Sequence, residues 1–368
     1  MNQPQIRDLT RYMDAWAPPV YQESYDNAGL LVGDPNVEIT GVLVSLDTTE
    51  AVVDEAIAKG CNIIVAHHPI VFRGLKKLNG KNYVERTVIK AIKNDVAIFA
   101  AHTNLDSVAG GVNYHIASRL GLKNVQILAP KTQVISKLVV FVPEADLANV
   151  LASIYEAGAG QIGAYDHCSF RVGGTGTFRP LDGVMPIVGA VGQDETVSEL
   201  RLEVILPTYL ESAVVLAMTT AHSYEVPAYD LYALNNANQT VGSGAVGDLP
   251  EAMDGKAWLQ YLKTSMNAAV IRHTPLIDRP IRRVAICGGA GSFLLSDASR
   301  AGADAFVTAD YKYHEFFDAE GKLVICDIGH YESEVFTKDL LQQRLAQKFT
   351  TFAVILAETN TNPVRYFF

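Results

Sequence analysis

The sequence predicts an α/β protein. Its three-layer α-β-α body has a mostly parallel sheet and is interrupted by an inserted α+β, ferredoxin-like domain. In the first 130 residues, short and continuously apolar runs alternate with helical segments, which is typical of parallel strands covered on both faces. From about residue 131 the order becomes strand, helix, strand, strand, helix, strand, as in ferredoxin-like modules. The alternation of short apolar runs and helical segments then resumes at residue 281.

The first part of the chain is expected to form the opening half of the body. Apolar residues recur at helical spacing from Ile6 to Trp16, so a helix comes first. The helix after the first strand has Thr48 or Thr49 as its N-cap and Gly60 as its C-terminal stop. The predicted strands are 39–47, 62–68 and 96–102, and the predicted helices are 6–16, 48–60, 83–95 and 112–121.

Residues 131–240 are expected to form the inserted domain. One of its helices ends at Gly158, and a Gly/Pro-rich connection separates its two middle strands. The stretch GGTGTF (173–178) favours a β-bulge or a hairpin turn. The predicted strands are 136–144, 167–180, 198–207 and 226–235, and the predicted helices are 146–158 and 210–222.

The body is predicted to be discontinuous, formed by residues 1–130 and 275–368. Residues 241–274 are expected to be a return linker with some helix at 255–270. Beyond it, the predicted strands begin at residue 281 and continue with 305–310, 322–329 and 352–358, and a long amphipathic helix is predicted at 331–349.

Composition is typical of a globular protein and excludes some classes of function. Hydrophobic residues make up 49% and charged residues 19%. No apolar run reaches the roughly 18 residues that a membrane span needs, and the N-terminus lacks signal-peptide features, so a cytoplasmic location is expected. The net charge of −10, without a Lys/Arg stripe, argues against nucleic acid as a partner. Scattered cysteines favour reduced core thiols over a disulfide framework or a zinc knuckle.

Histidines and carboxylates follow three of the predicted strands. The stretches are VAHHPIVF (65–72), AHTNLD (101–106) and GHYESE (329–334). Ligands of open α/β sheets gather beyond the carboxyl ends of the strands, so these side chains are expected to meet at one edge. The set supplies three imidazoles and two carboxylates: His67, His68, His330, Asp106 and Glu334.

Two interpretations compete for these residues. A single histidine at a strand end is usually a satisfied polar residue, and a His-x-x-x-Glu pair on a helix often just faces solvent. Together, imidazoles and carboxylates at one edge favour divalent metal ions. Because adjacent strand residues point to opposite faces, His67 and His68 are each expected to serve a different ion, bridged by Glu334 or Asp106. Pro69 helps to end the strand at these ligands.

Several residues near the expected site have two interpretations. Glu23 and Asp26 could hydrogen-bond to ligand imidazoles, or Asp26 could simply form a turn. His102 could position a substrate, orient a ligand or be structural. Lys312 and His314 follow another strand end, where they could receive a phosphate or act as a general acid.

The glycine-rich stretch CGGAGS (287–292) joins a strand to a helix. It resembles a loop that holds phosphate, but it lacks the full G-x-G-x-x-G pattern and the lysine of a P-loop. Tight packing of a strand-to-helix turn is the alternative reason for its glycines.

The motifs together resemble a known family. AHHPIVF, AHTNLD, GHYESE, YDNAGLLVGD (25–34) and TADYKYHE (308–315) look like those of the NGG-interacting-factor-three-like family. Its members are also called dinuclear metal-centre proteins, and many are labelled homologues of a type 2 GTP cyclohydrolase I. The resemblance covers nearly the whole chain, and AHSYEVPAYDLYAL (221–234) is similar to the PII-like (CutA-like) insert of the longer bacterial members.

The resemblance implies two divalent ions, Zn, Fe or Mn, held by the five residues named above. It also implies a toroidal homohexamer with the metal sites facing an internal cavity. Two motifs depart from the family pattern: Tyr25 stands where tryptophan is usual, and Ser223 stands where proline is common in the insert motif.

Two functions follow as alternatives. One is a metal-dependent hydrolase, in which a metal-bound water attacks a nucleotide or a phosphorylated small molecule with help from Lys312 or His314. The other is a non-enzymatic, metal-binding regulatory hexamer whose insert senses a small molecule or a partner. Nucleic acid within the ring is disfavoured by the acidic charge.

Overall fold

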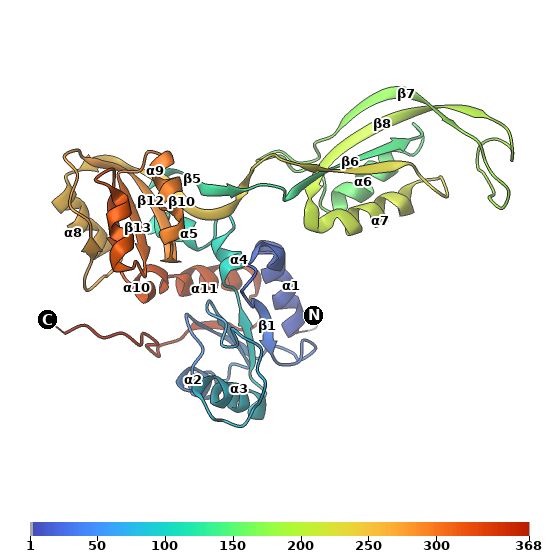
Figure 1. Cartoon of the computed structure of the whole chain (residues 1–368). Coiled ribbons are helices and arrows are strands. Elements are labelled where there is room, and N and C mark those ends of the chain that lie inside the picture. The colour runs from blue at the N-terminus through green and yellow to red at the C-terminus, as the bar shows by residue number, and fades with distance from the viewer. Residues whose placement is uncertain (1–2, 368) are drawn as a thin grey trace. The chain divides into compact units, whose positions relative to one another are not determined.

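A computed structural model describes residues 3–367. The chain forms two compact units. The body consists of the residues up to Ala129 together with those from Val241 onward, and the insert consists of Pro130–Thr240. Each unit has its own sheets, helices and core, and Figure 1 shows them along the colour scale of the chain.

The first sheet of the body has the strand order β1-β4-β3-β2-β15. Strands β2, β3, β4 and β15 run parallel, and β1 pairs antiparallel with β4. Every residue of β2, β3 and β4 is buried, which explains their continuously apolar sequences. The bounds are β1 (Gly29–Val32), β2 (Gly41–Ser45), β3 (Ile63–Ala66), β4 (Ala97–Ala100) and β15 (Ala353–Leu356).

The second sheet of the body has the order β11-β14-β13-β12-β10-β5. Its central strands β12, β13 and β14 are parallel, whereas β10 pairs antiparallel with β12 and β11 pairs antiparallel with β14. The prediction of a single sheet is therefore wrong, because the strands of the body form two separate sheets. Parallel pairing does predominate in the first sheet, whereas the second combines parallel and antiparallel pairs. The bounds are β5 (Lys123–Lys131), β10 (Asn238–Met253), β11 (Arg272–His273), β12 (Ile281–Ala290), β13 (Ala305–Ala309) and β14 (Val324–Asp327).

Helices cover both sheets of the body. Helices α2 and α3 contact the first sheet, while α11 contacts β2 and β15 as well as α5, which itself packs on β12. The α-helices are α1 (Ile6–Trp16), α2 (Glu50–Ala58), α3 (Tyr83–Lys93), α4 (Thr103–Asp106), α5 (Val112–Arg119), α8 (Gly255–Ser265), α9 (Leu295–Arg300), α10 (His330–Glu334) and α11 (Thr337–Lys348). The short 3₁₀ helices are η1 (Pro19–Tyr21), η3 (Ser292–Leu294) and η4 (Tyr313–Ala319).

Two predictions about the body need correction. Residues 241–274 are more than a linker, because they contribute most of β10 to the second sheet. The helix expected within 255–270 is present as α8, and its Trp258 is fully buried. The hydrophobic pattern of this segment is weak because small residues and glycines occupy much of β10. The helix predicted at 331–349 is two helices, α10 and α11, and α10 already begins at His330.

The insert has the element order β6-α6-β7-β8-α7-β9 that the sequence predicts, followed by the start of β10. Its sheet has the order β7-β8-β6-β9 with antiparallel pairing throughout. GGTGTF lies inside β7 and is neither a bulge nor a turn. The bounds are β6 (Ile135–Val142), α6 (Leu147–Glu156), β7 (Phe170–Phe178), β8 (Glu195–Pro207), η2 (Thr208–Leu210), α7 (Glu211–Ala221) and β9 (Tyr229–Leu234).

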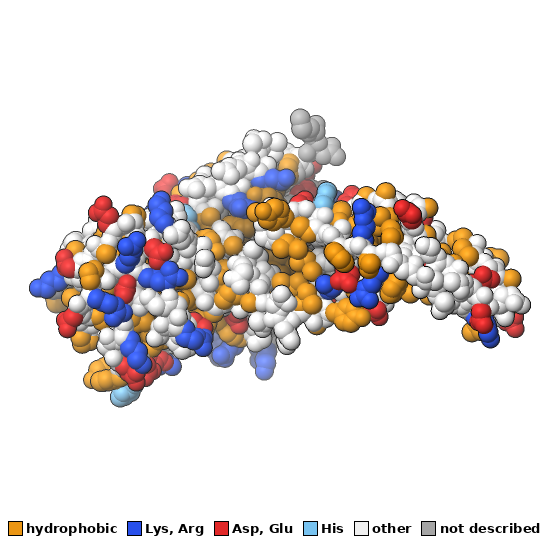
Figure 2. Space-filling view, turned by 90° about the horizontal axis from the view of Figure 1, so that it is seen from above, with side chains coloured by type: hydrophobic (Ala, Val, Ile, Leu, Met, Phe, Trp, Pro, Cys, Tyr) orange, Lys and Arg blue, Asp and Glu red, His pale blue; other side chains and the backbone are white. Residues whose placement is uncertain are grey.

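Two observations concern membrane-spanning potential and surface charge. In the described part of the chain, every helix is too short or too polar to cross a membrane. On the face shown in Figure 2, Lys and Arg side chains are interspersed with Asp and Glu, and the described residues there form no continuous basic stripe.

Candidate metal centre

His67 and His68 lie directly beyond β3. The amide of His67 donates to the carbonyl oxygens of Ser45 (3.3 Å) and Leu46 (3.1 Å), and the amide of His68 donates to Leu46 (2.9 Å). Pairing with the chain beyond β2 therefore continues through both histidines and holds their backbone rigidly. His67 is fully buried, whereas His68 is partly exposed.

Asp106 reaches the same place through a single helical turn. Helix α4 begins directly after His102, and the amide of Asp106 donates to the carbonyl oxygen of His102 (3.1 Å). The amide of Ala101 still pairs with Ala66 at the end of β3 (2.9 Å). The turn therefore starts beside β3 and places the Asp106 carboxylate next to His67.

His330 and Glu334 come from the second sheet. Gly329 has a φ of 91°, a backbone region that favours glycine, and it lets the chain turn from β14 into α10. Glu334 lies four residues after His330, on the same helix face, and its Oε2 is 3.0 Å from His330 Nε2. The cluster thus forms between two sheets of the body, and not at one edge of one sheet as predicted.

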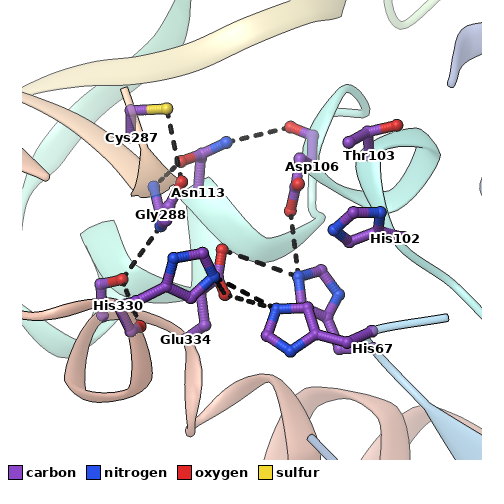
Figure 3. A network of polar contacts seen from close by, with 12 residues as sticks. His67, His102, Thr103, Asp106, Asn113, Cys287, Gly288, His330 and Glu334 are labelled. Atoms are coloured by element: carbon purple, nitrogen blue, oxygen red, sulfur yellow. Dashed lines mark hydrogen bonds and ion pairs between the residues drawn. The ribbon is translucent and has the colours of Figure 1, made fainter. Parts of the chain in front are cut away.

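The five residues form two groups that share Glu334. His67 Nε2 lies 3.7 Å from Asp106 Oδ1 and 3.8 Å from Glu334 Oε1. His68 Nε2 lies 2.9 Å from Glu334 Oε2 and 3.4 Å from His330 Nε2. Figure 3 shows the labelled imidazoles and both carboxylates pointing toward one another. Each oxygen of Glu334 therefore faces a different histidine group.

Each of the three imidazoles is held through its Nδ1 atom. His67 Nδ1 donates to the carbonyl oxygen of Ala101, His68 Nδ1 to Asp47 Oδ1, and His330 Nδ1 to Asp310 Oδ2, all at 2.7 Å. In a neutral imidazole, this arrangement leaves the lone pair on Nε2, the atom that faces the cluster. In metal sites, a histidine that binds the metal through one ring nitrogen typically donates a hydrogen bond from the other.

Two buried atoms test whether a cation fits here. His67 Nε2 and Asp106 Oδ1 are both buried and have no hydrogen-bond partner among the described residues. The two atoms lie 3.7 Å apart, which is too far for a hydrogen bond, and leaving buried polar atoms unpaired is costly. A divalent cation between them would satisfy both, so the donor set fits a metal ion.

Comparison with known proteins identifies the family of this chain. The family model described as Duf34/NIF3 (NGG1p interacting factor 3) matches residues 4–363. The chain belongs to the Duf34/NIF3 family. The resemblance found in its sequence motifs is thereby confirmed, and all five residues of the cluster lie within the matched range.

Individual relatives of this Duf34/NIF3 chain are similar over their whole length. "GTP cyclohydrolase 1 type 2 homolog" of Halalkalibacterium halodurans is 40% identical over 364 residues, which cover 97% of this chain and 98% of the relative. The Bacillus subtilis protein of the same name is 38% identical over 366 residues, 98% of each chain. Among solved structures, the Bacillus cereus protein related to NIF3 has a TM-score of 0.88, with 38% identity and 100% coverage of both chains.

The carboxylates of the Duf34/NIF3 cluster have opposite pKa shifts. Burial, and next the charge of Glu334, raises the pKa of Asp106 well above its ordinary value. Burial also acts to raise the pKa of Glu334, but hydrogen bonds from the histidines outweigh it and hold that pKa well below the ordinary range. The histidines therefore stabilise the negative charge of Glu334 more than that of Asp106.

The pKa values of two of the histidines are raised in this environment. Burial acts to lower the pKa of His68, but hydrogen bonds with Asp47 and Glu334 outweigh it and raise the pKa to about 10. The pKa of His330 rises to about 9, because Glu334 and Asp310 outweigh burial in the same way. The pocket therefore stabilises positive charge strongly, whether the charge is carried by protons or by a metal ion.

His102 extends the cluster. Its ring centre lies 5.3 Å from that of His67 and 5.5 Å from that of His68, and one group of ligand atoms within 4.8 Å joins these three histidines. Asp26 holds His102 Nδ1 at 2.7 Å and also accepts bonds from Thr103. Asp26 thus supports His102, and not one of the five cluster residues.

A cavity of about 420 Å³ opens onto the cluster. His68, Asp106, His330 and Glu334 line it, together with His102, Glu23 and the aromatic side chains of Tyr25, Phe72 and Phe293. Glu23 and His102, which were predicted to lie near the site, both line this cavity.

The first four residues of the CGGAGS stretch, 287–290, also line this cavity, and local packing explains two of its glycines. At Gly289, φ is +63°, and an added Cβ would lie 2.5 Å from Glu334 Oε1. At Gly291, a Cβ would lie 2.5 Å from Thr308 Oγ1 and from Cys287 Cβ. Packing against Glu334 at Gly289, and against Cys287 and Thr308 at Gly291, therefore accounts for these two glycines without a bound phosphate.

Lys312 and His314 lie outside this arrangement. Both are exposed, the Lys312 side chain at 85%, and neither lines the cavity beside the cluster. Asp310 has a left-handed backbone (φ 56°), which turns the chain after β13. The carboxylate of Asp310 reaches His330 while the following residues point elsewhere. A catalytic role for Lys312 and His314 stays a prediction.

Asp47 is the supporting residue that the sequence analysis missed. It follows β2, so the same rule that located the histidines, polar residues at the carboxyl ends of strands, would have found it. The signal was weak because an aspartate after a strand is common in turns.

Proposed function

We propose that this protein binds two divalent metal ions and acts as a metal-dependent hydrolase on a nucleotide or another phosphorylated small molecule. The convergence of three oriented Nε2 atoms and two carboxylates beside a cavity carries the proposal. The name of its relatives, GTP cyclohydrolase 1 type 2 homolog, points to the same substrate class. Imidazole and carboxylate ligands suit Zn, Fe or Mn.

The two groups divide the ligands between two sites. His67, Asp106 and one oxygen of Glu334 would hold one ion, and His68, His330 and the other oxygen would hold the second. Bound ions of this kind lower the pKa of a coordinated water and stabilise the charge of a displacement. The chain itself orients the ligands through Asp47, Asp310 and the backbone of Ala101, and His102 faces the cavity where a substrate would lie.

Metal content and turnover test this proposal together. The purified protein, supplied with Mn, Zn or Fe, should hold about two ions per chain and hydrolyse GTP or a member of a phosphoester panel. Asp106→Asn removes one negative ligand, so we expect one ion or less per chain and at least a ~100-fold loss of turnover. Asp182→Asn, an exposed change in the insert, is the matched control and should behave as wild type.

Two outcomes would contradict the proposal in different ways. Less than one ion per chain after metal supplementation would rule out the dinuclear site. Tight metal binding without any turnover that depends on Asp106 would rule out the hydrolase. That second outcome would favour the regulatory alternative.

A cavity in the insert favours the regulatory alternative as a second candidate. The cavity measures about 580 Å³ and is lined mainly by apolar side chains, among them Phe141, Val172 and Ile187. As a PII- or CutA-like module, the insert would bind a small effector there. Calorimetry with candidate effectors, on wild type and Val172→Glu, would test this role.

Assembly and location are parts of the same proposal. We expect a toroidal homohexamer, so light scattering after size-exclusion chromatography should give six times the 39.9 kDa of one chain. Cys61, Cys287 and Cys326 are buried free thiols, which suits the reducing cytoplasm.

A further inference from the structure

We propose that Thr361 is a positioning residue of the metal centre, acting through Asp47 on His68. The inference rests on the proposed metal binding and adds to it a segment far along the sequence, residues 357–366, here called the C-terminal tail. The evidence lies in the path of the tail, in the hydrogen bonds of Asp47 and in the way the tail is held.

Sheet topology brings the C-terminal tail to the metal centre. Strand β15 runs parallel to β2, with Leu356 opposite Val44, and the amide of Ala357 donates to the carbonyl oxygen of Val44 (2.8 Å). Parallel neighbours end at the same edge of a sheet. The residues after β15 therefore emerge beside Asp47, which follows β2.

Both oxygens of Asp47 are used. Oδ1 accepts from His68 Nδ1 at 2.7 Å, and Oδ2 accepts from the hydroxyl of Thr361 at 2.6 Å. The Thr361 hydroxyl thus fixes the rotation of the carboxylate that orients His68. The imidazole in turn presents its Nε2 to Glu334 Oε2, 2.9 Å away.

The other two histidines are oriented differently. His67 bonds to a backbone carbonyl, that of Ala101, which cannot rotate independently of the strand. His330 bonds to Asp310, which directly follows β13. For His68, the orienting carboxylate is itself oriented by the C-terminal tail, so changes in the tail should affect the ion that His68 holds.

The C-terminal tail is held in place at several points. Thr359 donates through its amide (3.0 Å) and its hydroxyl (2.6 Å) to Glu55 Oε2, and Asn362 donates to Glu332 Oε1 (3.3 Å). The tail also lines a second cavity, of about 470 Å³, that includes His68 and His330. Thr359 offers a matched control, because its hydroxyl makes the same kind of bond away from the metal centre.

The metal affinity of Thr361 variants tests the inference. Titration of the full-length protein with Co²⁺ against a chelator would give the affinity, and the visible absorption of bound Co²⁺ would report ligand geometry. We expect Thr361→Val to weaken one of two Co²⁺ sites by about tenfold and to change its spectrum, since loss of orienting bonds typically costs 10–100-fold. Thr361→Ser keeps the hydroxyl and should restore both properties.

Controls separate positioning from folding. Thr359→Val should lower thermal stability while leaving Co²⁺ affinity and the spectrum at wild-type values. In an Asp47→Asn background, Thr361→Val should have no further effect on affinity, because Thr361 acts through Asp47.

The outcomes distinguish this inference from the proposed function. If wild type binds two Co²⁺ ions and Thr361→Val binds both with unchanged affinity and spectrum, the role of Thr361 is overturned and the metal centre stands. If Thr359→Val weakens binding as much as Thr361→Val does, the effect is general destabilisation and the inference fails. If wild type binds no metal, both proposals fall.

Discussion

Orientation of the imidazoles is the decisive feature at the scale of single residues. His67, His68 and His330 each donate through Nδ1 to an acceptor at 2.7 Å and present Nε2 to the cluster. Histidines that are merely packed in a core need not all direct the same ring nitrogen toward one place. The repetition of one hydrogen-bond pattern at three independent positions supports metal binding over simple packing.

Metal binding should compete with protons, and its pH dependence follows from the histidine shifts. Without metal, the pKa is about 10 for His68 and about 9 for His330, so both imidazoles carry a proton at pH 7. A metal ion must displace these protons, and we expect affinity to rise steadily from pH 6 to about pH 9. Titration with Co²⁺ at constant ionic strength measures this rise, with proton release followed in weak buffer.

The metal-free protein should show the opposite dependence in its stability. Folded-state pKa values above the ordinary 6.5 contribute stability that is complete below pH 6.5 and lost as pH rises through 9 to 10. Chelated protein should therefore unfold at lower temperature as pH rises through this window. Affinity and stability that do not change with pH would contradict the charge assignments of the cluster.

Close packing between a strand and a helix is the main feature at the scale of elements. The end of β12 lies against α10, and Gly289 leaves the space that the Glu334 carboxylate occupies. A helix of five residues has little stability of its own, so this contact and Gly329 position α10.

Replacing Gly289 should remove metal binding, and a second glycine separates the causes. In Gly289→Ala, the left-handed backbone costs about 1–2 kcal/mol, and the Cβ also displaces Glu334. Gly302 has a similar φ of +71° with nothing within 4 Å, so Gly302→Ala measures the backbone cost alone. We expect the backbone strain to lower the free energy of unfolding by a similar amount in both variants. Only Gly289→Ala should lose its metal. Equal metal content in both variants would contradict the packing role of Gly289.

Division into two units is the main feature at the scale of the whole molecule. All the residues of the candidate centre lie in the body, and the insert has its own core, including Leu138, Ile154, Leu202 and Met218. The insert leaves the body after β5 and returns at β10, and these strands are neighbours in one sheet.

The body should therefore bind metal without the insert. A variant in which a short Gly/Ser linker replaces residues 132–237 should keep about two ions per chain and wild-type Co²⁺ affinity, because β5 and β10 already lie side by side. Elemental analysis and circular dichroism check metal content and folding. A folded variant that has lost its metal would show that the insert contributes to the centre.

Local patterns in the sequence account for much of this protein. Continuous apolar runs predicted β2, β3 and β4, because parallel strands buried on both faces need no polar residues. Strand-end positions and the four-residue spacing of His330 and Glu334 identified the five residues that the fold brings together. The motifs also identified the family, which the match over residues 4–363 confirms.

Tertiary structure alone decided how these pieces meet. The sequence could not show that the strands divide into two sheets, because antiparallel edges are long-range pairings with no local signature. It could not show that Thr361 bonds to Asp47, 314 residues away, or that Lys312 is exposed and lies outside the cavity beside the cluster. Residue type and spacing determine which chemistry is available. The directions of side chains, and the contacts between distant segments, depend on packing that forms only when the whole body folds.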